Sequence, residues 1–140
     1  MPSRSDYISE STRRLVEKRA NSYCEYCLIH EEDTYIGCEI DHIISIKHGG
    51  KNNDTNLAFS CLSCDRFKGT DIGSLTEKAI LTRFYNPRID NWLEHFQIIG
   101  NMILGITDIG EVTVKMLRIN DEERLEEREY LQNMGLFPKE

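Results

Sequence analysis

The fold is decided by residues 24–68, which read CEYCLIHEEDTYIGCEIDHIISIKHGGKNNDTNLAFSCLSCDRFK. Two Cys-x-x-Cys knuckles, Cys24/Cys27 and Cys61/Cys64, bound this stretch. Each knuckle can turn two sulfurs toward one side of an ion, so the pair predicts a tetrahedral zinc site with four thiolate ligands. Because 33 residues separate Cys27 from Cys61, we expect a folded insert between the knuckles. With every ligand position taken by cysteine, such a zinc is closed to substrate and therefore structural.

The cellular compartment decides whether the paired cysteines are expected to bind a metal or to form disulfides. No apolar run approaches the roughly 20 residues that a membrane-spanning helix needs, and the first six residues lack the apolar region of a secretory signal. We therefore expect a soluble, cytoplasmic protein with no membrane partner, in which paired knuckles favour a metal over disulfides. Two alternatives stay open: four free cysteines, or a redox protein that uses its Cys-x-x-Cys pairs. The fifth cysteine, Cys38, is expected to be a small buried apolar residue.

The insert between the knuckles has the pattern of strand, loop, strand and helix. β-Branched residues predict a strand within residues 35–46, and the polar run 49–56 predicts a loop. Residues 57–60 predict a second strand, and a helix runs from Cys64 to about Lys68. A helix capped by serine is expected at residues 9–20, before the first knuckle.

Beyond residue 71 the patterns are weaker. We expect a helix within residues 75–84 and a hairpin of residues 96–99 and 102–106 around a Gly-Asn turn. Two further helices are expected at residues 112–119 and 121–134. The length of 140 residues predicts one domain over residues 1–140.

Residues with hydrolytic potential lie inside this stretch. Asp41 offers a hard oxygen ligand of the kind that Mg²⁺ prefers, and His42 beside it can act as a general base. Asp65 supplies a second oxygen ligand on the opening turn of the helix, and Lys68 follows one turn later, where it could reach a phosphate. Neighbouring strand residues point to opposite faces, so Asp41 and His42 converge only where the strand ends or bends.

Taken together, these motifs resemble the HNH (ββα-metal) endonuclease family in its zinc-stapled form. The matching text is the two knuckles, Asp41-His42-Ile-Ile, His48-Gly-Gly, Asn56-Leu57 and Cys64-Asp-Arg-Phe-Lys68-Gly. The resemblance covers a core of about residues 13–70, followed by a C-terminal extension, residues 71–140. It implies an α+β fold: a small ββα-metal core with a structural zinc, an N-terminal helix, and a C-terminal hairpin plus helices.

The resemblance also implies a role for each matching residue. Asp41 and Asp65 would hold a catalytic Mg²⁺ or Mn²⁺, His42 would be the general base, and Asn56 would brace the loop and help orient that base. The residues assigned to nucleic-acid binding are Lys68, His48 and Arg66. Asp65 departs from the family pattern, which has Asn or His at this position.

The implied function is a metal-dependent endonuclease that hydrolyses DNA phosphodiester bonds with one catalytic metal. The alternative is a catalytically decayed, zinc-stapled module that binds nucleic acid or protein. The net charge of −7 is unevenly distributed, because residues 1–88 carry 12 Lys and Arg against 13 Asp and Glu. A near-neutral core with local basic residues can still hold a phosphate backbone. The sequence predicts no particular oligomeric state.

Overall fold

The computed structural model describes residues 7–138, so the first six residues, on which the expectation about a secretory signal rests, lie outside the described part. The helices are α1 (Glu10–Arg19), α2 (Leu62–Lys68), α3 (Trp92–His95), α4 (Asp108–Met116) and α5 (Glu122–Asn133), with 3-10 turns η2 (Glu31–Asp33), η3 (Ile46–His48) and η4 (Asp54–Asn56). The strands are β1 (Cys38–His42), β2 (Leu57–Cys61), β3 (Gly73–Leu75), β4 (Leu81–Arg83), β5 (Phe96–Ile99) and β6 (Met102–Gly105). The predicted α+β class is confirmed. None of the helices within residues 7–138 is both long and apolar enough to cross a membrane.

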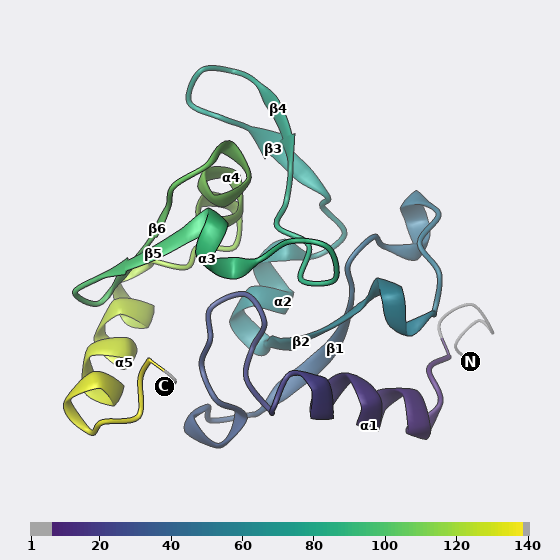
Figure 1. Cartoon of the computed structure of the whole chain (residues 1–140), viewed down its shortest axis with the longest axis horizontal. Helices are drawn as coiled ribbons and strands as arrows, with labels where there is room; N and C mark the ends of the chain where they lie inside the picture. The colour runs from purple at the N-terminus through teal and green to yellow at the C-terminus, as the bar shows by residue number, and fades with distance from the viewer. Residues whose placement is uncertain (1–6, 139–140) are drawn as a thin grey trace.

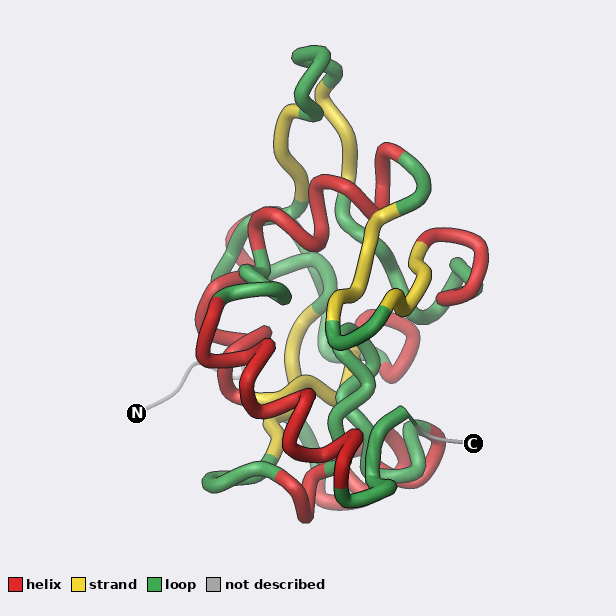
Figure 2. Tube along the Cα trace, turned by 90° about the vertical axis from the view of Figure 1, so that its left-hand side faces the viewer, coloured by secondary structure: helices red, strands yellow, loops and turns green. Residues whose placement is uncertain are grey.

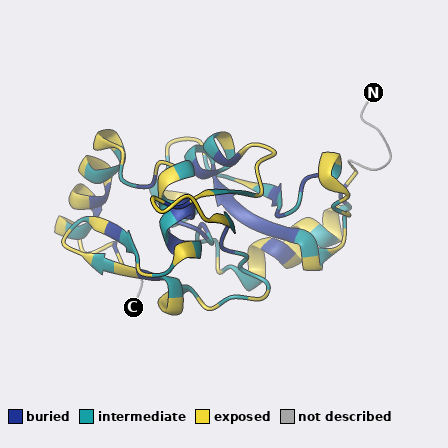
Figure 3. Cartoon of the chain, turned by 90° about the horizontal axis from the view of Figure 1, so that it is seen from above, coloured by how far each residue is buried: buried dark blue, intermediate teal, exposed yellow. Residues whose placement is uncertain are grey.

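The centre of the fold is a two-stranded antiparallel ribbon followed directly by a helix (Figure 1). Strands β1 and β2 pair from Cys38 opposite Cys61 to His42 opposite Leu57, and α2 begins at the residue after β2. Both α1 and α2 pack against this ribbon. All five residues of β2 are buried because its two faces belong to different hydrophobic clusters. Figure 3 shows the buried residues gathered in the interior and the exposed ones on the outer helices and loops.

Local sequence signals account for the N-terminal elements. The Ser9 side chain accepts a hydrogen bond from the Thr12 amide at 3.2 Å and caps α1, as the sequence predicts. Val16 is the fully buried residue of that helix. The strand expected within residues 35–46 is shorter than predicted, because the side chains of Tyr35 and Ile36 are exposed in a loop that precedes β1.

The C-terminal extension contains two antiparallel hairpins, β3–β4 and β5–β6, and the helices α3, α4 and α5. The hairpin β5–β6 turns at Gly100-Asn101 as predicted, whereas α4 overlaps the helix predicted at residues 112–119 but begins and ends earlier in the chain. The prediction of a helix within residues 75–84 is wrong, because β3 and β4 form a hairpin there (Figure 2). Its apolar residues Leu75 and Leu81 are exposed, so the helix-like spacing does not correspond to a buried face.

One hydrophobic cluster joins the extension to the knuckles. It contains cysteines of both knuckles together with Phe96 of β5, Ile103 of β6 and Leu131 of α5. Polar contacts follow the same path: the Trp92 indole donates to the Tyr26 carbonyl at 2.9 Å, and Arg88 pairs with Glu25. The extension is therefore packed against the core at the knuckle Cys24–Cys27.

Candidate metal centre and active site

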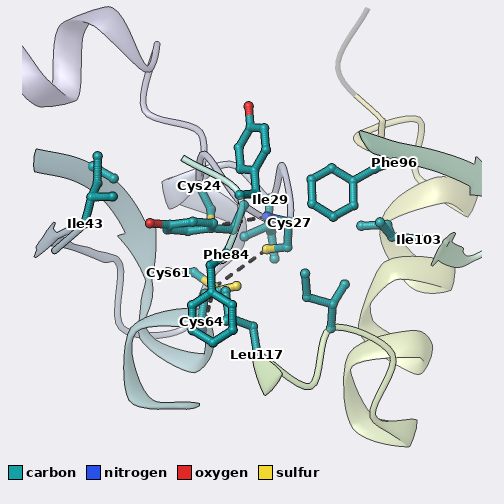
Figure 4. Packing of buried hydrophobic residues seen from close by; sticks show 14 of the residues in the cluster. Cys24, Cys27, Ile29, Ile43, Cys61, Cys64, Phe84, Phe96, Ile103 and Leu117 are labelled. Atoms are coloured by element: carbon teal, nitrogen blue, oxygen red, sulfur yellow. Dashed lines mark hydrogen bonds between the residues drawn. The ribbon is translucent and has the colours of Figure 1, made fainter. Parts of the chain in front are cut away.

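The four knuckle cysteines meet in the interior, as Figure 4 shows. Their sulfurs all lie within 4.8 Å of one another, and the Sγ atoms of Cys27 and Cys61 are 3.7 Å apart. Tetrahedral zinc with Zn–S bonds of about 2.3 Å requires sulfurs about 3.8 Å apart. Over residues 7–138 no other group of three or more potential ligand side chains is this tightly gathered. The residues therefore fit a structural zinc ion.

The knuckles are shaped by hydrogen bonds from the backbone to sulfur. The Cys27 amide donates to Cys24 Sγ at 3.5 Å, and the Cys64 amide donates to Cys61 Sγ at 3.4 Å. Cys61 is also the N-cap of α2, so the second knuckle forms the first turn of that helix. Burial raises the pKa of the Cys64 thiol above its ordinary value, which means that complete ionisation of the cluster needs a cation.

Cys38 lies outside this cluster. It is half-buried at the start of β1 and packs against both hydrophobic clusters, and burial raises the pKa of its thiol. These observations agree with the apolar packing role predicted for it.

The second candidate site is built around the Asp41 carboxyl group near the end of β1. Only 6% of Asp41 is exposed, and its Oδ2 lies 3.0 Å from Lys68 Nζ and 3.5 Å from the Tyr26 hydroxyl. The Asp65 side chain, on α2, is near enough for its charge to act on the Asp41 carboxyl group. Burial raises the pKa of Asp41 to about 6; Lys68 opposes this shift and Asp65 adds to it. The structure thus brings together the two carboxyl groups that the sequence assigns to a divalent ion.

Lys68 occupies a different environment from the one predicted. Its ammonium group is buried, pairs with Asp41 and donates to the His42 carbonyl oxygen at 2.9 Å. The last turn of the short helix α2 directs the side chain under β1 and away from solvent. The assignment of Lys68 to nucleic-acid binding is therefore corrected: at this position it balances the charge of Asp41. The other two residues of that assignment, His48 and Arg66, are exposed.

We expect Lys68→Met to destabilise the protein at pH 8 by about 3 kcal/mol, since removing one partner of a buried ion pair leaves the other uncompensated. The loss should be smaller at pH 5. Asp41 in the parent has a pKa near 6 against 3.8 unfolded, so at pH 5 it is largely protonated and gains little from Lys68. Above pH 6 the parent holds an ion pair, whereas the variant must bury a lone carboxylate or bind a proton.

Urea unfolding of the zinc-loaded protein at both pH values measures this difference. The double variant Asp41→Asn/Lys68→Met is the matched control and should recover most of the loss, because both charges are gone. An equal loss at pH 5 and pH 8 would mean that Lys68 acts through packing rather than through its charge.

The side chain of His42 contacts a residue outside the pair Asp41 and Asp65. Its Nε2 lies 2.7 Å from Oδ1 of Asn52, in the loop that leads to η4. An amide oxygen accepts hydrogen bonds, so Nε2 carries the proton and Nδ1 keeps its lone pair. Sequence reasoning missed Asn52, because the loop holds three asparagines and no local signal tells which of them contacts the histidine.

Asn56 links the start of the loop to its end. Its Oδ1 accepts from the Ile44 amide, and its Nδ2 donates to the carbonyl oxygens of Ile44 and Lys51, all at 2.9 Å. Gly50 lies inside this bracket, where a Cβ would be 1.7 Å from the Ile44 carbonyl oxygen and 2.8 Å from Asn56 Nδ2. Asn56 thus contacts loop backbone, while Asn52 contacts the His42 ring.

We expect Gly50→Ala to lower stability by about 2–3 kcal/mol, because the added methyl must displace backbone rather than a flexible side chain. For a chain of this size the melting temperature should fall by roughly 10 °C. Gly49→Ala is the control: it adds a methyl in open space at φ +91°, and should cost about 1 kcal/mol of backbone strain. Thermal melts of equal size for the two variants would rule out the contact with Ile44 as the cause.

These features define a class of protein: a ββα fold with four cysteines positioned to bind zinc, and with Asp41 and His42 at the end of its first strand. The sequence model of the HNH endonuclease family matches residues 24–71, about a third of the chain, which confirms the resemblance predicted for this stretch. No curated protein and no solved structure matches the chain. The family match supports a nuclease-type or nucleic-acid-binding role.

Proposed function

We propose that this protein is a metal-dependent HNH endonuclease that hydrolyses DNA phosphodiester bonds with one catalytic metal. The observation that supports the proposal is the proximity of the Asp65 carboxyl group to Asp41, near the end of β1 and next in sequence to a histidine held by Asn52. Mg²⁺ is commonly held by one or two protein carboxylates, with waters and substrate phosphate as its other ligands. Asp41 and Asp65 match that ligand set.

The chemistry divides between the ion and the residues of the chain. Bound at Asp41 and Asp65, Mg²⁺ or Mn²⁺ would neutralise the charge that develops on the phosphate and the leaving oxygen. His42 Nδ1 would accept the proton of the attacking water, since Nε2 is already bonded to Asn52. Lys68 holds the buried Asp41 ionised near neutral pH, so that its carboxylate is ready to bind a cation.

The substrate surface is proposed around the exposed residues His48, in the loop after β1, and Arg66, which follows Asp65. Arg66 is on α2, one residue after Asp65, and can contact a phosphate of the DNA backbone. We also propose a cytoplasmic location, because zinc thiolates persist in a reducing compartment.

One observation favours the second candidate, a binding module without catalysis. The ion pair with Lys68 already neutralises the charge of Asp41, and Asp65 stands where the family has Asn or His. A module of this kind would keep the zinc site and the exposed basic residues and would bind DNA without cutting it.

Cleavage of supercoiled plasmid by the zinc-loaded protein, with Mg²⁺, Mn²⁺ or Ni²⁺ added in turn, separates the two candidates. A nuclease nicks the plasmid in at least one of these metals and loses that activity in Asp41→Asn. Asp65→Asn should retain or raise activity, because an amide oxygen still binds the ion and one negative charge is removed from beside the phosphate. DNA binding in a gel shift with no cleavage in any metal would instead establish the binding module.

A further inference from the structure

The C-terminal helix α5 places a cation on the zinc ligands. Nη2 of Arg124 lies 3.1 Å from Cys64 Sγ and 3.7 Å from Cys61 Sγ. Nη1 of the same guanidinium donates to the Leu117 carbonyl oxygen at 2.8 Å, on the segment that joins α4 to α5. Arg124 therefore bridges the second knuckle and the C-terminal extension, 60 residues further along the chain.

The charge of the cluster explains why a cation is favourable here. Four thiolates around one Zn²⁺ carry a net charge of −2, and the four cysteines are buried. An uncompensated buried charge is costly, while a guanidinium that donates to thiolate sulfur offsets part of it and fixes the ligand orientation. Arg124 is the residue of α5 with contacts to these sulfurs.

We propose that Arg124 is an outer-shell residue of the zinc site, and that zinc binding and docking of helix α5 stabilise each other through it. The acidic helix α5 is thus attached to the HNH core by the charge of the zinc site, in addition to its apolar residue Leu131. The coupling is reciprocal: whatever free energy α5 contributes to zinc binding, zinc contributes to the docking of α5. This inference holds whether or not the protein cleaves DNA.

Arg128, one turn further along α5, provides a matched control. Its guanidinium donates to the carbonyl oxygens of Asn101 at 2.7 Å and Ile119 at 2.9 Å, and it lies over the Phe137 ring. It fixes the same helix to the same extension through carbonyl oxygens and an aromatic ring, with no sulfur among these partners. A general loosening of α5, or the loss of a positive charge at a distance, should therefore affect Arg124→Gln and Arg128→Gln alike, because the charge of Arg128 also acts on Cys27 and Cys64. An effect of direct donation to sulfur belongs to Arg124.

Zinc affinity of the full-length protein, measured by competition with a chromophoric chelator, tests the proposal. We expect Arg124→Gln to weaken zinc binding 10–100-fold, Arg124→Lys to recover part of the loss, and Arg128→Gln to change it less than threefold. Affinity of Arg124→Gln within twofold of the parent, or a loss equal to that of Arg128→Gln, would overturn the proposal.

Hydrogen exchange of the parent gives a readout that needs no variant to fold. Amides of residues 122–133 should lose protection together with the zinc, exchanging at least tenfold faster after the ion is removed by chelation. Unchanged protection of α5 after zinc removal would show that the helix docks independently of the metal site.

Discussion

Replacing His42 with alanine should slow DNA cleavage about 10²–10⁴-fold, the usual contribution of a positioned general base. The imidazole ends β1 with Nε2 bonded to Asn52, so its Nδ1 is the atom free to take a proton from water. The side chain is partly exposed, and its removal opens no cavity in either hydrophobic cluster. Stability and zinc content should therefore stay close to those of the parent. Single-turnover cleavage of a labelled duplex measures the effect directly.

Two variants make this prediction specific. His48→Ala removes an exposed loop histidine from the same segment and should change the rate less than tenfold. Asn52→Ala should act through His42, because without the hydrogen bond to Asn52 neither the orientation of the ring nor the position of its proton is fixed. We expect it to lower the turnover rate and to leave the affinity for DNA unchanged. Equal rates for the parent and His42→Ala would exclude the histidine as the base. Restoration of His42→Ala cleavage by added imidazole would strengthen the assignment.

The parts of the fold that the sequence predicts are those with local causes. A Cys-x-x-Cys turn brings its two sulfurs together over four residues, and a serine before an amphipathic run caps a helix. The same holds for the Gly100-Asn101 hairpin. These signals act within a few residues, so the zinc staple, α1 and β5–β6 can be predicted without knowing the rest of the chain.

The two failures have different causes: a turn that the residue types do not mark, and packing between distant segments. The run from Leu75 to Phe84 has helix-like spacing, yet the turn ends in Ala79 at φ 62° and the chain pairs β3 with β4 instead. The spacing of Lys68 from Asp65 predicts that the two residues share one face of the helix. It does not predict that Lys68 packs against strand β1. Burial of the ammonium against Asp41 depends on how α2 packs on β1.

The residues of the candidate site also divide into those that local sequence signals identify and those that only the structure shows. Asp41, His42 and Asp65 are identified by their places beside a strand end and a cysteine knuckle. Asn52 and Arg124 carry no such local mark, because one is a loop amide among several and the other is an arginine in a charged helix. Their contacts, to His42 and to the thiolates, follow only from the assembled structure.

Removal of the structural zinc should unfold the core between the two knuckles. Binding of structural zinc contributes an apparent 10–16 kcal/mol in small zinc domains, whereas a whole domain is stable by about 5–15 kcal/mol. The cysteines lie in the main hydrophobic cluster beside Phe96 and Leu117, so loss of the ion also weakens the packing of the extension (Figure 4). Circular dichroism and thermal melts before and after chelation, with elemental analysis showing one zinc per chain, measure the change.

Cys64→Ser and Cys38→Ser form the matched pair for this prediction. Cys64 is fully buried and belongs to the cluster, so its serine variant should lose zinc and cooperative melting. Cys38 is half-buried and lies outside the cluster, so its variant should keep one zinc and lose less than about 2 kcal/mol. If Cys64→Ser melted like Cys38→Ser, the thiols would not be metal ligands and the redox alternative would gain support.

Since His42 and Asp41 lie on the strand that pairs with the strand ending at Cys61, zinc loss should abolish cleavage as well, although the ion itself takes no part in the reaction.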